Sequence, residues 1–450
     1  MIRILATIGP SSANPSVIKA FSRKTNLFRL NGSHNKLDWH LEAVRLIREI
    51  CPDALILLDV PGIKPRTDNP ENIGIKKGQI VSFGISSNAG ERLVVPLTRP
   101  LPQIHHHVEQ FSINDGQFLF QTTGVSDGFI EGKSLSDFVL KPRKGLNIPN
   151  SVYDNEAQLL VYENFIESIS DLDVNALGLS FVQSCELINK IKKIKPKLAM
   201  IAKIENSEGL KNCREVISAA DAVMIDRGDL AAEIGMSELF GSIETIARET
   251  KWAGKPLIMA TENLETMMTR QLPSKSEVMS IAHSISIGAD CIMLSEETAI
   301  SENGVAIVTW LDDHLKRLPD TVKYLSKLPR EKKFPEIWQM LSAIDDMQVL
   351  IMSKSGHAIF NYLAIKPNAR FAVVSDNPKI SNVLKLLAND TKFLESKLSN
   401  KKPFEVVRSV LQDNKTTLFA DQDKLLTIHV SEYARSPRAN CITVFHKDDF

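Results

Sequence analysis

The chain has 450 residues, 43% of them hydrophobic and 24% charged, and its 54 basic and 54 acidic side chains leave no formal net charge. This length exceeds what one hydrophobic core holds, so two or three domains are expected. The balanced charge excludes a global field of the kind that draws a protein to nucleic acid or to an anionic membrane.

The cysteines and the first residues indicate a cellular location. The five cysteines lie far apart and none belongs to a CxxC pair, which is typical of a reducing compartment and argues against a cysteine-bound zinc ion. No apolar run reaches the length of a membrane-spanning helix. The chain opens on a strand-like segment at residues 2–7, without a signal-peptide pattern. We therefore expect a cytoplasmic protein.

Short apolar runs alternate with stretches of helical periodicity from residue 1 to about residue 325. The predicted strands are residues 2–7, 27–31, 54–59, 176–181, 199–205, 222–226, 256–261 and 291–295. Strands that alternate with helices predict a parallel sheet, and eight is the number that closes a (β/α)8 barrel.

The alternation is interrupted once and then replaced. Residues 66–147 carry short β-rich pieces and many glycines, and after about residue 326 a basic, proline-containing link at residues 328–333 leads to four more apolar runs. The predicted fold is α/β: a (β/α)8 TIM barrel at residues 1–67 and 148–325, a small β-barrel domain inserted at 68–147, and an open α/β domain at 335–450.

Polar side chains end six of the predicted strands, although an interior strand needs apolar residues. They are Arg29 and Asn31, Asp59, Lys203 and Glu205, residues 226–229, Thr261 and Glu262, and residues 295–297. The carboxyl ends of barrel strands meet on one face, where active sites lie. A solvated rim is the alternative, but six converging ends of both charge signs favour an active site.

These side chains suit phosphoryl transfer. The carboxylates of Glu205 and Asp229 are hard oxygen ligands of the kind that hold Mg2+ or Mn2+. Arg29, Arg66 and Lys203 supply positive charge for a phosphorylated acid, because phosphoryl transfer is catalysed mainly by positioning and charge neutralisation. A predicted helix opens at residues 228–231, and its free backbone N–H groups can bind an anion.

At these positions the sequence resembles the pyruvate kinase family, in the family's order and over nearly the whole chain. The matching segments are ATIGPSS at 6–12, FRLNGSH at 28–34, NDG at 114–116, KGLNIP at 144–149, AKIEN at 202–206, RGDL at 227–230, AGKP at 253–256 and GADCIMLS at 288–295. The resemblance implies a homotetrameric glycolytic enzyme that uses phosphoenolpyruvate and ADP and yields pyruvate and ATP.

The resemblance also implies residue roles. Glu205 and Asp229 would bind the divalent metal, and Lys203 and Arg29 would stabilise the phosphoryl group in transfer. Thr261, supported by Ser295 and Glu297, would belong to the route that protonates the enolate. The residues implied to contact substrate or nucleotide are Arg29, Asn31, His34, Arg66, Lys144, Gly228, Asp229 and Thr261. The inserted domain would close over them as a lid that excludes water.

A monovalent-cation region is implied at Asn31, Ser33 and Asp59, but the sequence departs from the family beside it. Val60 replaces a threonine whose hydroxyl is a cation ligand, and Lys64 stands where potassium-requiring members carry glutamate. We therefore predict that Lys64 acts as a cation surrogate and that K+ is not required.

Three acidic departures leave the substrate open. Asp226 replaces an alanine of the family pattern, Glu262 a glutamine and Glu296 a glycine. An unpaired like charge at about 6 Å costs roughly 3 kcal/mol at an effective dielectric of about 20. The alternatives to pyruvate kinase are a paralogue that acts on another keto acid or enol phosphate, as a lyase or another transferase, and a non-catalytic ligand-sensing relative. The retained Arg66 and Lys144 favour ADP.

A loop in the last domain is a further candidate binding site. Residues 353–357, SKSGH, follow a predicted strand and precede a predicted helix. The loop resembles the place where some family members bind a sugar-phosphate effector. A purely structural role in that domain is the alternative.

Overall fold

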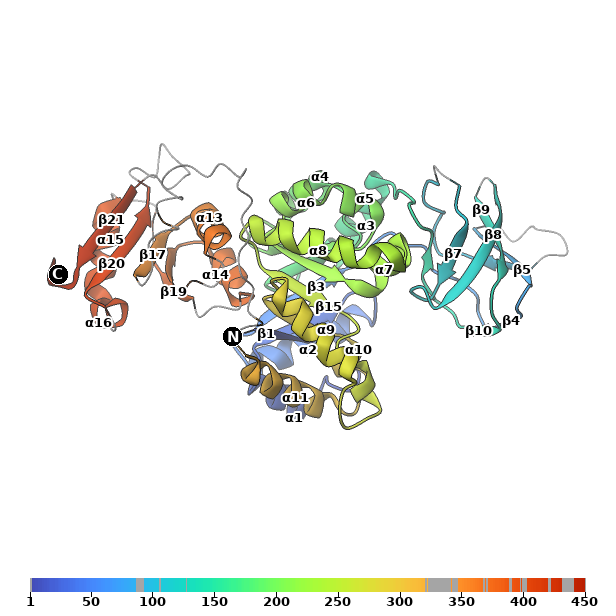
Figure 1. The fold of residues 1–450 in the computed structure, drawn as a ribbon, viewed down its shortest axis with the longest axis horizontal. Coiled ribbons are helices and arrows are strands. Elements are labelled where there is room, and N and C mark those ends of the chain that lie inside the picture. Colours follow the sequence, from blue (N-terminus) through green and yellow to red (C-terminus); the bar gives the residue numbers. More distant parts are fainter. Residues whose placement is uncertain are drawn as a thin grey trace.

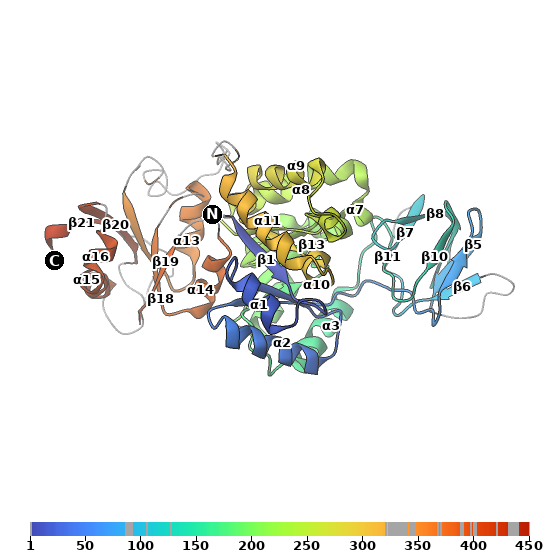
Figure 2. The same ribbon diagram turned by 90° about the horizontal axis from the view of Figure 1, so that it is seen from below.

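The computed structural model describes residues 2–85, 93–104, 107–126, 128–319, 322, 341, 347–366, 369, 371–387, 391–396, 398, 403–419, 422–430 and 441–449. Three units follow one another along the long axis of the molecule (Figures 1 and 2). The barrel lies in the middle, the inserted β-rich unit at one end and the C-terminal unit at the other. No helix within these ranges is long and apolar enough to cross a membrane.

Eight parallel strands close a barrel, as predicted. They are β1 (Arg3–Thr7), β2 (Leu27–Asn31), β3 (Leu55–Val60), β12 (Ala176–Leu179), β13 (Ala199–Ile204), β14 (Ala222–Asp226), β15 (Leu257–Ala260) and β16 (Cys291–Leu294). Alternate side chains fill the interior and pack against the surrounding helices, so the strands are buried on both faces. This double burial explains why they read as continuous apolar runs.

Helices cover the outside of the barrel. They are α1 (Pro15–Ser22), α2 (Leu37–Ile50), α3 (Asn155–Ser168), α4 (Cys185–Ile194), α5 (Ser207–Lys211), α6 (Cys213–Ala219), α7 (Arg227–Ile234), α8 (Met236–Trp252), η1 (Glu265–Met268), α9 (Lys275–Ser286), α10 (Glu296–Ala299) and α11 (Gly304–Arg317). Local sequence fixes several starts: Asn14 caps α1 ahead of Pro15, and Ser274 with Glu277 forms a capping box on α9.

The inserted unit is all-β and follows β3. Its strands are β4 (Ile73–Ile75), β5 (Ile80–Gly84), β6 (Leu93–Pro96), β7 (Gln110–Ile113), β8 (Phe118–Ser126), β9 (Phe129–Ser134), β10 (Phe138–Leu140) and β11 (Leu146–Asn147). The described strands form a six-stranded and a two-stranded sheet where one small barrel was predicted. The three-residue strands β4 and β10 pair only with each other, and packed rings of Phe83, Phe111 and Phe120 fill the core.

The C-terminal unit is an α/β sheet with helices on both faces. Its strands run β19-β18-β17-β20-β21, and the last pair is antiparallel. Their bounds are Lys392–Glu395, Ala372–Ser375, Gln348–Met352, Lys424–His429 and Cys441–His446, and the helices are α13 (His357–Ile365), α14 (Pro378–Lys385), α15 (Pro403–Asp413), α16 (Lys415–Leu418) and η3 (Lys447–Asp449). The link at 328–333 and the boundaries at 325 and 335 lie outside the described residues, and the three-domain division stays a prediction.

The C-terminal unit closes one end of the barrel. Val383 of α14 and Leu386 after it share a hydrophobic cluster with the barrel interior, including Leu5 and Cys291. The Arg3 side chain donates to the Leu387 carbonyl at 3.1 Å. The inserted unit leaves from the carboxyl end of β3, so the carboxyl ends of the strands open toward the inserted unit.

Candidate active site

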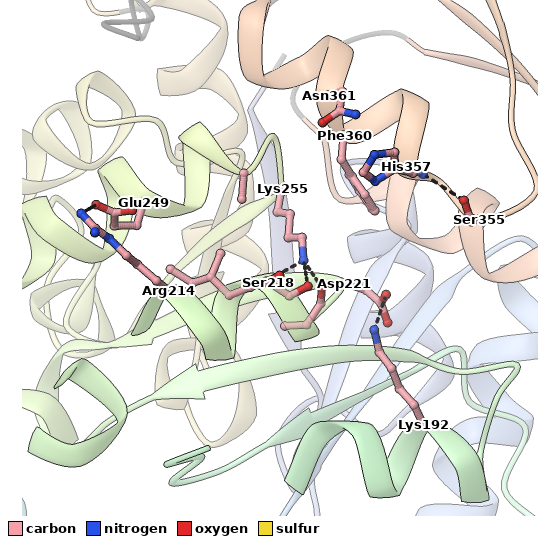
Figure 3. A pocket seen from close by; sticks show the side chains of 13 residues that line it. Lys192, Arg214, Ser218, Asp221, Glu249, Lys255, Ser355, His357, Phe360 and Asn361 are labelled. Carbon is pink, nitrogen blue, oxygen red and sulfur yellow. Dashed lines mark hydrogen bonds and ion pairs between the residues drawn. The ribbon is translucent and has the colours of Figure 1, made fainter. Parts of the chain in front are cut away.

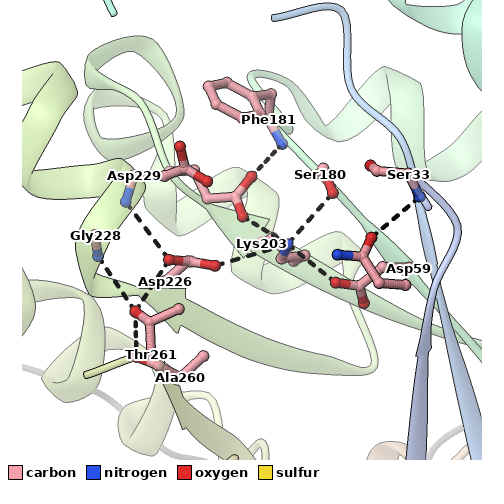
Figure 4. A network of polar contacts seen from close by, with 12 residues as sticks. Ser33, Asp59, Ser180, Phe181, Lys203, Asp226, Gly228, Asp229, Ala260 and Thr261 are labelled. Atoms are coloured by element: carbon pink, nitrogen blue, oxygen red, sulfur yellow. Dashed lines mark hydrogen bonds and ion pairs between the residues drawn. The ribbon is translucent and has the colours of Figure 1, made fainter. Parts of the chain in front are cut away.

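Lys203 lies at the centre of the polar side chains that gather at this open end (Figure 4). Its Nζ is 2.7 Å from Glu205 Oε1, 3.1 Å from Asp59 Oδ2 and 3.9 Å from an Asp226 carboxylate oxygen. Burial alone would lower the pKa of this lysine, but the surrounding carboxylates outweigh burial and raise it. Lys203 is therefore a permanent buried cation, held by carboxylates at the ends of β3, β13 and β14.

Arg29 on β2 is fixed by the same carboxylate of β3 that contacts Lys203. Its Nε and one terminal nitrogen donate to Asp59 Oδ2 at 3.0 and 2.8 Å, and the other terminal nitrogen donates to Thr7 Oγ1 at 3.2 Å. Burial alone would raise the pKa of Asp59, but Arg29 and Lys203 hold it below its usual range. Asp59 thus stays ionised and positions both cations.

Three carboxylates form a cluster beside Lys203. Single oxygens of Glu205, Asp226 and Asp229 all lie within 4.8 Å of one another. Glu205 is fully buried, and its Oε2, the oxygen that is not paired with Lys203, accepts a hydrogen bond from the Phe181 backbone N–H at 2.8 Å. Burial raises the pKa of Glu205 to about 8 although Lys203 opposes this shift. A set of hard oxygen donors this close fits a divalent cation such as Mg2+ or Mn2+.

Asp226 was noted in the sequence as a departure from the family pattern, and its place in this cluster was missed. It ends β14 and caps α7, and its Oδ1 accepts from the Asp229 backbone N–H at 3.5 Å. Burial, with Asp229 nearby, raises the pKa of Asp226. Its position directly after an apolar strand, three residues before Asp229, is the signal that could have placed it.

Thr261 joins the ends of β14 and β15 (Figure 4). Its hydroxyl lies within hydrogen-bond distance of two acceptors, the Ala260 carbonyl at 2.8 Å and Asp226 Oδ1 at 3.1 Å. The hydroxyl oxygen of Thr261 accepts from the backbone N–H groups of Arg227 at 3.1 Å and Gly228 at 3.3 Å. The residue has a φ of 59°, which is uncommon for a β-branched side chain. The surrounding hydrogen bonds hold this conformation.

Ser295 and Glu297 lie on the next strand end. The buried carboxylate of Glu297 accepts from the backbone N–H groups of Ser295 at 2.6 Å and Leu264 at 3.1 Å. It therefore ties the loop after β16 to the loop after β15. Among the contacts of the described residues, none joins Ser295 or Glu297 to Thr261.

Lys64 links the inserted unit to the barrel. Its Nζ is 2.5 Å from Asp229 Oδ1 and 2.9 Å from Asp115 Oδ1, which lies in the turn between β7 and β8. Burial alone would lower the pKa of Lys64, and these carboxylates raise it above its ordinary value. Within the described residues, Lys64 contacts Asp115, Asp229 and the Phe181 ring, and it has no contact with Asn31, Ser33 or Asp59. Its charge therefore lies on the side of the Asp229 carboxylate.

The remaining predicted contact residues surround this centre. Asn31 Oδ1 accepts from the Ser33 N–H at 3.1 Å, and a terminal nitrogen of Arg66 donates to the Arg143 carbonyl at 3.2 Å. Partial burial lowers the pKa of His34, and the positive charges of Arg66 and Arg29 add to this shift. Lys144 is half-exposed, and its positive charge also lowers the pKa of His34. The acidic departures Glu262 and Glu296 are both exposed.

A separate cavity of about 660 Å³ lies between the barrel and the C-terminal unit (Figure 3). Ser355 and His357 of the SKSGH loop line it together with Lys192, Asp221 and Lys255 of the barrel. Lys255 donates to the backbone carbonyls of α6 and its C-cap, at 2.5 to 2.6 Å. The cavity contains none of the predicted catalytic residues, and effector binding at the loop stays a prediction.

Comparison with known proteins agrees with this geometry. Residues 1–307 match the family model described as pyruvate kinase, barrel domain. The chain is 28% identical to a pyruvate kinase of Thermococcus litoralis over 408 residues, covering 85% of this chain and 86% of that one. It is 32% identical to a pyruvate kinase of Agrobacterium vitis over 309 residues, covering 66% and 65%.

Solved structures show the same fold. A pyruvate kinase from Pyrobaculum aerophilum superposes with a TM-score of 0.77 at 19% identity, covering 99% of this chain and 98% of that one. One from Cryptosporidium parvum superposes with a TM-score of 0.78 at 22% identity, covering 99% and 96%. Because the family model spans more than half of the chain, this protein belongs to the pyruvate kinase family.

Proposed function

We propose that this chain is a pyruvate kinase that transfers the phosphoryl group of phosphoenolpyruvate to ADP, giving pyruvate and ATP, with Mg2+ or Mn2+ as cofactor. In this reaction the bond between the enol oxygen and phosphorus breaks and a bond to a β-phosphate oxygen of ADP forms. The enolate then takes a proton at its terminal carbon. One observation carries the proposal: a buried Lys203 ammonium beside both the Arg29–Asp59 pair and the carboxylate cluster.

The carboxylate cluster is the place for the divalent cation. Glu205 and Asp229 would hold it, in accord with their closely spaced oxygens. When bound, the cation supplies positive charge that offsets the charge of the two anionic substrates. Lys64 adds a fixed positive charge beside Asp229, one of the proposed metal ligands.

Lys203 and Arg29 act on the phosphoryl group. Both cations are already oriented by Asp59, so little reorganisation is needed when negative charge spreads over the phosphoryl oxygens. Arg66, Lys144, Asn31, His34 and Gly228 complete the proposed contacts to substrate and nucleotide. The inserted unit, whose turn residue Asp115 meets Lys64, would act as a lid that excludes water.

Thr261 is the proposed positioning group for enolate protonation. Its hydroxyl is fixed between Asp226 and the first backbone N–H groups of α7. Glu297 supports this region by tying the loops after β15 and β16 together. Ser295 is the third residue of the proposed proton route, after Thr261 and Glu297.

K+ is not required in our proposal. The buried ammonium of Lys64 brings a permanent positive charge to the site, whereas a glutamate there would bring a negative one. Cytoplasmic location and a homotetramer are proposed as well. Exposed Met236 and Phe240 on α8, and Met279 on α9, support self-association.

A paralogue with another keto acid or enol phosphate as substrate is the second candidate. The observation that favours it is Asp226, whose extra negative charge lies inside the site. Glu262 and Glu296 favour it less, since both side chains are exposed to solvent.

One assay tests both candidates. Purified protein is incubated with phosphoenolpyruvate, ADP and Mg2+ or Mn2+ in K+-free buffer, and pyruvate is followed. Metal-dependent turnover that Glu205→Ala abolishes supports pyruvate kinase. Absence of turnover, together with metal-dependent deuterium exchange at the methyl group of pyruvate, supports the paralogue. Absence of both, with ligand binding retained, indicates the non-catalytic relative.

A further inference from the structure

Asp226 lies beside the two carboxylates that would hold the divalent cation. The residue ends β14 and caps α7, so both elements fix its backbone. It is 7% exposed, and one of its oxygens lies within 4.8 Å of single oxygens of Glu205 and Asp229. Two oxygens on one octahedral Mg2+ are roughly 3 to 4 Å apart. Small side-chain rotations would therefore bring all three oxygens onto one ion.

The two oxygens of Asp226 have different surroundings. Oδ1 accepts hydrogen bonds from the Thr261 hydroxyl at 3.1 Å and the Asp229 N–H at 3.5 Å. Oδ2 is 3.9 Å from the Lys203 ammonium nitrogen, which is beyond hydrogen-bond distance. The hydrogen-bond donors near Asp226 thus lie on the Oδ1 side and leave Oδ2 for another partner.

The charges of the cluster point to that partner. Lys203 contacts Glu205 at 2.7 Å and Lys64 contacts Asp229 at 2.5 Å, but the Asp226 carboxylate has no cation at comparable distance among the described residues. Three neighbouring carboxylates repel one another unless positive charge lies among them. A bound divalent cation would remove this repulsion.

We propose that Asp226 is a third protein ligand of the divalent cation, in addition to Glu205 and Asp229. The inference rests on the proposed function only in that it uses the same cation. The resemblance places alanine at this position, so the third ligand distinguishes this chain from the family pattern. An octahedral cation with three protein oxygens keeps three positions for substrate oxygens and water.

The third ligand has opposite effects on cation and substrate. An additional carboxylate tightens binding of the cation in the absence of substrate. The same negative charge weakens binding of an anionic substrate to the loaded site. Asp226→Ala is therefore expected to raise the Kd for the metal and to lower the KM for phosphoenolpyruvate at saturating metal.

The test measures Mn2+ binding to the full chain without substrate or nucleotide, from the electron paramagnetic resonance signal of free Mn2+. We expect Asp226→Ala to weaken binding at least about tenfold, the lower end of the loss seen when groups that only support metal ligands are removed. Glu296→Gln is the matched control, because it removes an exposed carboxylate at the same open end, and its Kd should stay within about twofold of wild type. An equally small change in Asp226→Ala overturns the proposal.

Asp226→Asn covers the case in which the alanine variant does not fold. Asparagine keeps the size of the side chain and an oxygen that accepts from Thr261, but it lacks the charge. Weaker Mn2+ binding in this variant supports the proposal, and unchanged binding overturns it.

The binding measurement is independent of turnover. A wild-type chain without pyruvate kinase activity whose Asp226→Ala variant still loses Mn2+ affinity would refute the proposed function and support the third ligand. Normal wild-type turnover with unchanged Mn2+ binding in Asp226→Ala would support the proposed function and refute the third ligand.

Discussion

At the scale of single residues, the site depends on carboxylates that keep cations in place. Asp59 contacts Arg29 and Lys203 at about 3 Å with the same oxygen. The arrangement lowers the pKa of Asp59 despite burial. Asp59 is therefore ionised at neutral pH and keeps both cations in place. Preorganised charge of this kind stabilises a transition state without reorganisation at the moment of reaction.

Lys203→Met tests the role of the central cation. Methionine fills similar space but cannot stabilise the phosphoryl group, so we expect kcat to fall by about 10²- to 10³-fold or more. Mn2+ should still bind, because Glu205, Asp226 and Asp229 remain. Steady-state kinetics and Mn2+ titration check the two expectations. A variant with nearly normal kcat would show that Lys203 has no part in the transfer.

Lys64→Glu tests the independence from K+. Wild type should reach full activity in K+-free buffer. The variant loses the positive charge 2.5 Å from Asp229, so its activity should become strongly dependent on K+. The measurement compares activity in K+ with activity in tetramethylammonium. Lys64→Gln should show the weaker effect of losing charge without reversing it. A wild type that needs added K+ would contradict the prediction.

At the scale of elements, ion pairs connect the first and last helices of the barrel. Asp312 on α11 lies 2.7 Å from Lys24, which follows α1, and 2.7 Å from Lys316 one turn further along α11. Burial alone would raise the pKa of Asp312, but the two lysines lower it. The Asp312–Lys24 pair connects α11 to the segment after α1, where the last βα unit of the barrel meets the first.

Asp312→Asn should lower the free energy of unfolding at pH 7 by about 0.5–1 kcal/mol, the upper part of the range for solvent-screened ion pairs, because both lysine partners are partly exposed. Because the folded-state pKa of Asp312 is lowered, its stabilising contribution is present above the unfolded pKa of about 4 and is lost as the pH falls through the folded value. The gap between wild type and variant should therefore narrow below about pH 4. Thermal unfolding of both proteins from pH 7 to pH 3 measures this difference in stability. Asp313→Asn is the control, since that side chain is 51% exposed and 3.5 Å from Lys24.

At the scale of the whole molecule, α8 and α13 join the barrel to the C-terminal unit. Gly254 ends the turn after α8 with a φ of 67°, and a Cβ there would lie 1.8 Å from the Phe360 carbonyl oxygen of α13. Lys255 beside it lies 5.7 Å from the centre of the Phe360 ring. Close backbone approach therefore requires glycine at this contact.

Gly254→Ala should lower the melting temperature and expose the contact to protease. The left-handed conformation alone costs about 1–2 kcal/mol for alanine, and the clash with α13 adds to that cost. Gly241→Ala on α8 is a matched control, because nothing lies within 4 Å of its added Cβ and alanine favours a helix. Equal melting temperatures of the two variants would show that the contact does not contribute to stability.

The sequence alone determined the barrel, and it predicted most of the residues that the structure brings together at the open end. Strands buried on both faces give continuous apolar runs, and the polar residues that end them stand out, so Arg29, Asp59, Lys203 and Glu205 were predicted together. The partners of each side chain were decided only by tertiary structure. Asp226 lies with the other carboxylates because β13 and β14 are neighbours in the barrel, and Lys64 contacts Asp115 because the inserted unit folds back on the barrel. Such contacts join segments far apart in the chain, and periodicity and motif spacing report only what is local.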